Sequence, residues 1–266
     1  DAIDGKNPSE MTKEEMVAII GAYATADAAV NKLDDGRDTK KKLQADLAGL
    51  KKTVEEIEAK YAQKVIEGVW DDLKNGTLDK TQLETLKKTL EALEEFVPDS
   101  LKESYKQVVD AVDAAINAVD LINEAKDLIN QLQQEIKDGK ISQDTIDQLQ
   151  DVVKKASGLV NQIKENPILK NAVDAIIKQA EAALKEAAAR AAIEAVKAAL
   201  VGGNLEKINQ AFDAANDAID ALEPYMPELA ETLREQLNAL KEQVYDKVLK
   251  GAQDILNDPK YKSEQE

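Results

Sequence analysis

Apolar residues recur every three or four positions along most of the chain, with charged and amide side chains between them. Three runs show the spacing most clearly, and they comprise Leu83, Leu86, Leu90, Leu93 and Val97; Ile146, Leu149, Val153, Ala156, Val160 and Ile163; and Leu229, Leu233, Leu237, Leu240, Val244 and Val248. This spacing places the apolar side chains on one face of a helix, as in helical bundles. Because no segment alternates convincingly as a strand does, the pattern predicts an all-α fold.

Glycines and prolines divide the helical pattern into segments. Gly76, Gly139 and the pair Gly202-Gly203 are placed to end helices, and prolines at 98, 167 and 227 are placed to begin them. Thr12 followed by Glu15 fits a capping box at the first helix start. The predicted helices span 12–33, 38–74, 78–96, 98–137, 142–165, 167–200, 204–223 and 227–257.

Short and long segments alternate with a period of about 63 residues, the spacing from Gly76 to Gly139 and from Gly139 to Gly202. Such a period indicates degenerate repeats, about four of them, each with one short and one long helix. A short helix of about 20 residues runs about 30 Å, whereas a long one is nearly twice that. The lengths therefore predict that each long helix is split between two successive three-helix bundles, as in spectrin-like rods.

The segment 98–137 shows a change of facing that such sharing requires. Its apolar seam steps by three residues, from Val119 to Ile122, where the heptad pattern calls for four. A shift of this kind rotates the apolar face around the helix. The alternative interpretation is ordinary irregularity within one long bundle.

The expected architecture is therefore elongated, with tandem three-helix bundles joined by shared long helices. The expected domains are a partial helical unit at 1–56, bundles at 57–116, 118–182 and 184–257, and a polar tail or linker at 258–266. Repeats of this kind are stabilised by contacts with their immediate neighbours. A start at Asp1 rather than Met is what we expect of a processed chain or of part of a larger one.

Composition narrows the function classes. The 266 residues include no Cys and no His, and 35 Lys and Arg against 52 Asp and Glu give a net charge of −17. The missing residue types remove thiol nucleophiles, Cys-ligated metals and the usual serine triad, so we expect no enzyme, no cofactor and no metal site. The negative charge argues against nucleic acid as a partner, and no apolar stretch is long enough to predict a membrane span.

One segment departs from the acidic background, since residues 37–64 carry eight basic against five acidic side chains. The predicted ligand-binding residues are Arg37, Lys40, Lys41, Lys42, Lys51 and Lys52. A local basic excess of this kind suits an anionic polymer or an acidic partner. The alternative is a solvated helix face with pairs four residues apart.

Three further features each have two interpretations. Trp70 lies on an apolar helix face, which favours the bundle core over a ligand platform. The loop at 34–38 is acidic and contains Gly36, but it lacks EF-hand spacing, which favours a solvated turn over a calcium site. Tyr225 lies between two prolines, where it either caps a bundle end or anchors a partner.

A resemblance to a known family lies toward the C-terminal end. It is carried by Ala195-Val196-Lys197, by Gly203-Asn204-Leu205-Glu206-Lys207 and by the helices through Leu222 and Val248. This region, mainly residues 195–250, resembles the end of the helical N-terminal rod of Gram-positive S-layer (cell-surface) proteins. The resemblance implies triple-helical bundles with shared long helices, attachment to cell-wall polysaccharide, and an extracellular, cell-surface location.

We therefore expect a non-catalytic structural or spacer rod of an S-layer-like surface protein, one that contributes to cell-wall attachment. Its expected partner is cell-wall polysaccharide or another surface protein. Two alternatives stay open. One is a surface binding module for a host protein or wall polymer, and the other is an acidic helical-bundle coat protein of a protozoan parasite.

Overall fold

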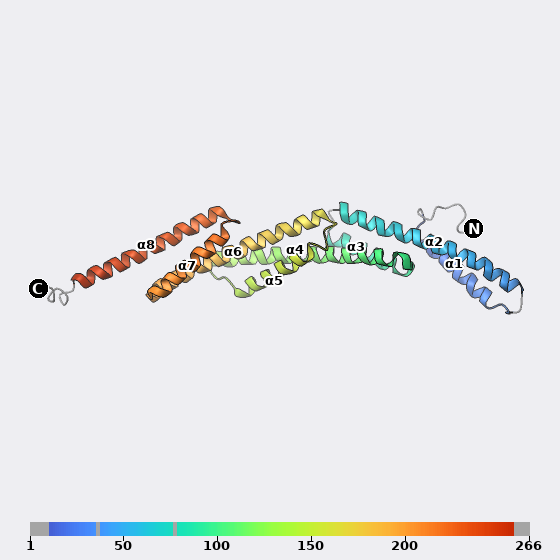
Figure 1. The fold of residues 1–266 in the computed structure, drawn as a ribbon, viewed down its shortest axis with the longest axis horizontal. Coiled ribbons are helices and arrows are strands. Elements are labelled where there is room, and N and C mark those ends of the chain that lie inside the picture. Colours follow the sequence, from blue (N-terminus) through green and yellow to red (C-terminus); the bar gives the residue numbers. More distant parts are fainter. Residues whose placement is uncertain (1–10, 36–37, 77–78, 258–266) are drawn as a thin grey trace. The chain divides into compact units, whose positions relative to one another are not determined.

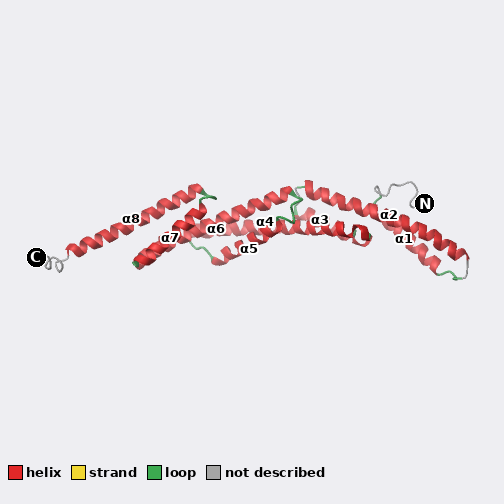
Figure 2. Cartoon of the chain, in the orientation of Figure 1, coloured by secondary structure: helices red, strands yellow, loops and turns green. Residues whose placement is uncertain are grey.

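The computed structural model describes residues 11–35, 38–76 and 79–257, and in these ranges every regular element is a helix (Figures 1 and 2). The predicted all-α class is therefore confirmed. In chain order the elements are α1 (Lys13–Asn31), α2 (Asp38–Asn75), α3 (Lys80–Glu91), η2 (Glu94–Phe96), η3 (Asp99–Leu101), α4 (Lys102–Asp138), α5 (Gln143–Leu159), α6 (Pro167–Gly202), α7 (Leu205–Leu222) and α8 (Pro227–Asn257), where η marks a 3-10 helix.

Most predicted helix boundaries lie within a few residues of the observed ones, but two helices end earlier than predicted. The helix predicted over 78–96 ends at Glu91, and a 3-10 turn at Glu94–Phe96 follows it. The helix predicted over 142–165 ends at Leu159. In each case the last apolar residues of the run, Leu93 and Ile163, are still buried, and turns rather than a further helical turn carry them there.

The helix starts follow from local side-chain chemistry. Thr12 and Glu15 form the predicted capping box, in which each side chain bonds the backbone N–H of the other residue. Asp79 and Gln82 form a second capping box at α3. Asn166 caps α6 by accepting the Leu169 N–H at 2.8 Å, immediately before the proline at the first helical position.

The chain divides into two compact units. Unit 1 comprises Asp1–Asp120 and Leu159–Asn171, and unit 2 comprises Leu121–Gly158 and Ala172–Glu266. The helix α4 is one unbroken helix, with residues 102–120 in unit 1 and 121–138 in unit 2. The finer predicted division into three bundles and a partial unit stays a prediction.

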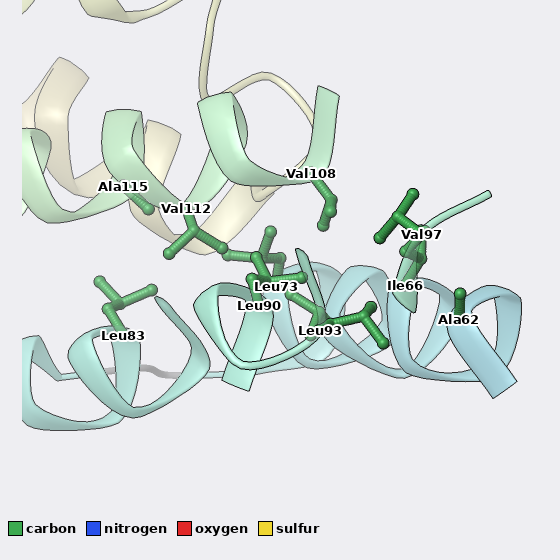
Figure 3. Close-up of a cluster of buried hydrophobic side chains, with 11 residues drawn as sticks. Ala62, Ile66, Leu73, Leu83, Leu90, Leu93, Val97, Val108, Val112 and Ala115 are labelled. Atoms are coloured by element: carbon green, nitrogen blue, oxygen red, sulfur yellow. The ribbon is translucent and has the colours of Figure 1, made fainter. Parts of the chain in front are cut away.

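The core of unit 1 lies between α2, α3 and the first half of α4 (Figure 3). Leu83 and Leu90 of α3 are fully buried there, together with Val108 and Val112 of α4. Their aliphatic side chains remove apolar surface from water, which is the main stabilising contribution to a bundle of this kind.

A second cluster in unit 1 joins α1 to the first half of α2. Met16 and Ile19 of α1 pack against Val54 and Ile57 of α2, and Tyr61 borders both this cluster and the larger one. In Figure 1 the two helices lie side by side as a hairpin. We call this pair the α1–α2 hairpin, covering residues 13–57.

Unit 2 contains a three-helix cluster formed by α6, α7 and the first half of α8. Ile193 and Val196 of α6, Ile219 of α7, and Leu233 and Leu237 of α8 are buried in it. The second half of α4 and α5 also belong to unit 2, and Glu135 of α4 accepts hydrogen bonds from the Ser142 N–H and the Thr145 hydroxyl at the turn between them. Among the residues described, no helix is long and apolar enough to cross a membrane.

Candidate functional site

Unit 1 has a groove of about 1020 Å³ beside the single tryptophan of the chain. We call it the Trp70 groove. Its walls come from α2, from α4 and from the turn that precedes α6, and they comprise Glu67, Trp70, Asp71, Lys74, Gln107, Asp110, Ala111, Asp113, Ala114, Asn117, Gln162, Lys164 and Glu165.

Trp70 has two roles in the structure. Its half-buried side chain packs against the unit 1 core, as the sequence predicts, and it also lines the groove. Lys74 lies one helical turn further on, with its Nζ 5.8 Å from the centroid of the Trp70 ring, a cation–π contact. Trp70 therefore presents part of an aromatic surface to the groove from a position fixed by the core.

The groove is acidic. Its lining includes five carboxylates and two lysines, and the remaining polar groups are the amides of Gln107, Asn117 and Gln162. Asp113 accepts a hydrogen bond from Lys87 Nζ at 2.8 Å, and this bond raises the pKa of Lys87. A negative lining of this kind repels an anionic polymer and suits a neutral or cationic ligand.

An aromatic ring flanked by amides and carboxylates can recognise a polar ligand that has an apolar face. The ring supplies apolar contact, while the amides offer both donors and acceptors and the carboxylates accept. Sugar rings combine these properties, since their hydroxyl groups lie around an apolar face. In the described part of the chain, no three His, Cys, Asp or Glu side chains come together in a way that could hold a metal ion.

The part of the Trp70 groove that α2 contributes can be derived from the sequence. Glu67, Trp70, Asp71 and Lys74 recur at three and four positions, so they share one helix face. The contribution from residues 162–165 was not visible, because the apolar spacing predicts a helix there and the structure has turns.

Lys40, predicted to bind a ligand, is occupied by the protein's own backbone. Its side chain is 8% exposed, and its Nζ donates to the carbonyl oxygens of Asn31 at 3.3 Å and Leu33 at 2.6 Å and to the carboxylate of Asp35. The hydrogen bond to Lys40 also lowers the pKa of Asp35. Lys40 thus holds the turn between α1 and α2 by satisfying carbonyls at the C-terminal end of α1.

The other predicted ligand-binding residues do not converge on the Trp70 groove. Lys41, Lys42, Lys51 and Lys52 are exposed on α2, and Lys51 lies 3.8 Å from Glu55, four residues further along. Arg37 lies outside the described residues. Ligand binding by these side chains stays a prediction.

The structure describes part of the acidic loop at 34–38, and it describes Tyr225, the predicted anchor. In the loop at 34–38, Asp35 pairs with Lys40, and Gly36 and Arg37 lie outside the described residues. Tyr225 is 40% exposed at the α7–α8 connection, and its hydroxyl bonds the Glu181 carboxylate at 3.0 Å.

No protein-family model, curated protein or solved structure matches the chain.

Proposed function

We propose that this chain is a non-catalytic structural spacer built from tandem three-helix bundles that share their long helices. The observation that supports the proposal is α4, whose 37 residues form one continuous helix with residues in both units. A helix that contributes residues to two successive compact units is the connection that tandem bundles with shared helices require. We infer that such a chain would serve as a spacer for whatever is attached to it.

Two further features are consistent with a spacer. The cores are built from Ala, Leu, Ile and Val seams between closely packed helices, and the net charge of −17 favours a strongly solvated outer surface. We also propose an extracellular, cell-surface setting, which rests on the resemblance of residues 195–250 to the helical rods of S-layer proteins.

Small-angle X-ray scattering of the chain at high dilution tests the spacer proposal. An elongated arrangement gives a radius of gyration well above the roughly 18 Å expected of a compact domain of this length. A compact profile would contradict the proposal. High dilution keeps this measurement free of any association between copies.

The Trp70 groove favours a second candidate function, the binding of a neutral wall saccharide on the side of the spacer. Because Trp70 is the only tryptophan, its fluorescence reports groove occupancy directly. We expect a neutral amino-sugar oligosaccharide to change the Trp70 emission in a saturable way, and an anionic polymer to leave it unchanged. Loss of the response in Asp110→Asn and Gln107→Ala, with Asp144→Asn as an exposed control outside the groove, would assign it to this site.

If the neutral oligosaccharide leaves the emission unchanged at millimolar concentration, the saccharide proposal is wrong. A response to the anionic polymer alone would also contradict it, and would return attention to the basic side chains of α2.

A further inference from the structure

The second half of α8 is an amphipathic helix that packs against no other helix among the described residues of its unit. From Lys241 to Leu256 no side chain is buried. Yet this stretch carries a wide apolar face of exposed or half-exposed residues, namely Val244, Tyr245, Val248, Leu249, Ala252, Ile255 and Leu256. In Figure 1 no other helix of the unit lies beside this end of α8.

This apolar face continues an interface that already exists. Leu233 and Leu237 of α8 are buried against α6 and α7, Leu240 borders the same cluster, and Val244 and Val248 follow on the same side of the helix. A surface helix normally turns such a face toward a core. The face is also wider than the narrow seam of a two-stranded coiled coil, so it suits two partner helices rather than one.

The second halves of the other long helices are packed against neighbouring helices. The second halves of α2, α4 and α6 all bury side chains, among them Ile66 and Val69 of α2, Leu132 of α4, and Ile193 and Val196 of α6. Both α2 and α6 bury them against the short helix that follows and the first half of the next long helix. The second half of α8 is the exception, since none of its side chains from Lys241 to Leu256 is buried.

The α1–α2 hairpin has an apolar seam that only one side of the pair covers. It is a short helix followed by the first half of a long helix, and the two pack on each other as a pair. Val17 of α1 and Leu43 and Leu50 of α2 are 37–48% exposed, although Leu43 and Leu50 belong to the same heptad seam as the buried Leu47 and Val54. One side of the hairpin seam is therefore covered and the other is open.

The composition of α1 points in the same direction. Its 11 residues from Met16 to Ala26 include no charged side chain, yet of these only Met16 and Ile19 are buried. A helix that is apolar around its whole circumference is normally enclosed by other helices. In the hairpin α1 has one helical neighbour, so most of its apolar surface faces water.

We propose that copies of this chain associate head to tail, with the second half of α8 from one copy docking as the third helix on the α1–α2 hairpin of the next. The resulting bundle would have the same composition as those within the chain: the second half of a long helix, a short helix, and the first half of another long helix. We call the second half of α8 the donor surface and the α1–α2 hairpin the acceptor surface. The interface is heterologous, so an assembly of any length keeps one unoccupied donor surface and one unoccupied acceptor surface, and open chains can grow.

Length and charge fit this pairing. Residues 241–257 span about 25 Å and α1 about 28 Å, so the two match over nearly their full length. Residues 241–257 carry three lysines against three acidic residues, and the hairpin helices carry six lysines against seven. In a chain of net charge −17 these are nearly neutral surfaces, so contact between them costs little repulsion.

Sedimentation velocity of the full chain, from about 1 μM to about 1 mM, tests the proposal. The wild-type chain should form larger species as its concentration rises. A donor variant, Leu249→Glu with Leu256→Glu, and an acceptor variant, Leu43→Glu with Leu50→Glu, should each raise the dissociation constant more than about tenfold. All four side chains are exposed, so circular dichroism should show each variant as helical as the wild type.

The matched control is Val201→Glu with Leu205→Glu, which makes the same change at two exposed apolar residues beside the α6–α7 turn. It should associate like the wild type. If it were equally impaired, added charge alone would explain the loss and the proposal would fail.

Mixing the two variants gives the decisive result. The donor variant keeps an intact hairpin and the acceptor variant keeps an intact α8, so an equimolar mixture should form a 1:1 dimer and nothing larger. Association of the acceptor variant with itself would instead indicate α8–α8 pairing and overturn the proposal. So would a monomeric mixture, or a wild-type chain that stays monomeric at every concentration.

Discussion

Lys40 Nζ lies 2.6 Å from the carbonyl oxygen of Leu33, and this bond links the first turn of α2 to the chain just beyond α1. The same ammonium group also donates to the Asn31 carbonyl and the Asp35 carboxylate. A lysine in a basic run on an amphipathic helix thus acts as the cap of the preceding helix. The hairpin depends on this side chain for its turn.

Replacing Lys40 by Met should therefore destabilise unit 1. The substitution keeps most of the aliphatic side chain but removes the donor, so two carbonyls lose a charged partner. The expected loss is about 1–3 kcal/mol in the free energy of unfolding. Urea unfolding followed by Trp70 fluorescence would measure it. Lys41→Met, at an exposed neighbour, should change the stability by less than about 0.5 kcal/mol, and equal effects at the two positions would refute the capping role.

Glu135 should make the stability of unit 2 depend on pH. One of its carboxylate oxygens accepts from Gln131 and Thr145, and the other accepts from the Ser142 N–H. These hydrogen bonds, that from Gln131 foremost, lower the pKa of Glu135 from the ordinary value of 4.5. A lowered pKa in the folded state means that the ionised form is favoured by folding.

The stability of unit 2 should therefore decrease at low pH. The stabilisation is present above the unfolded-state pKa, and it is lost as the pH falls through the folded-state pKa. At pH 7, Glu135→Gln should cost about 1–2 kcal/mol in the free energy of unfolding. The difference between variant and wild type should shrink below pH 4.5, as unfolding curves by circular dichroism would show. A difference that stayed constant from pH 7 to pH 3 would mean that the carboxylate charge is not involved.

Two glycines should respond in opposite directions to substitution by alanine. Gly139 ends α4 with φ of 68°, a backbone conformation that L-residues adopt at a cost of about 1–2 kcal/mol, so Gly139→Ala should be destabilising by that amount. Gly68 lies within α2 with open space around its missing Cβ, so Gly68→Ala should stabilise the helix by about 0.5–1 kcal/mol. Melting temperatures that moved in the same direction for both variants would contradict this assignment.

The sequence predicts the helices well because the information is local. Capping residues such as Thr12, glycine stops such as Gly139 and the three- and four-residue apolar spacing each act within a few positions. The two helices that end early show where local information is insufficient. Apolar spacing records that Leu93 and Ile163 face a core, but a 3-10 turn or a sequence of turns can bring them there as well as another helical turn.

The Trp70 groove was only half predictable for a related reason. Trp70 and Lys74, four positions apart, share a helix face that can be derived from spacing alone. The opposing wall, with Asp110 and Gln107, depends on how α4 is rotated against α2, and that rotation is set by packing between residues about 40 positions apart. The role of Lys40 could not be derived from the basic run on α2, because the carbonyls that it bonds belong to the end of α1 and the turn after it.

The early end of α3 leads to a final prediction, about Tyr105. Where the helix ends, the Leu90 carbonyl accepts the Leu93 N–H at 2.8 Å, and it accepts a second hydrogen bond from Tyr105 Oη of α4 at 3.0 Å. Tyr105→Phe keeps the ring in place and removes this hydrogen bond. It should reduce the free energy of unfolding of unit 1 by about 0.5–1.5 kcal/mol, as measured by urea unfolding with Trp70 fluorescence.

The same substitution at Tyr225 is the matched control. Its hydroxyl donates to the Glu181 carboxylate in an exposed hydrogen bond that water can replace, so Tyr225→Phe should cost less than about 0.5 kcal/mol. Circular dichroism would measure the loss, because Tyr225 lies in unit 2. The two variants thus compare one lost hydroxyl at a half-buried helix end with one at the surface. If Tyr105→Phe proved as neutral as the control, the Leu93 N–H, which also bonds the Leu90 carbonyl at 2.8 Å, would be sufficient to hold the end of α3.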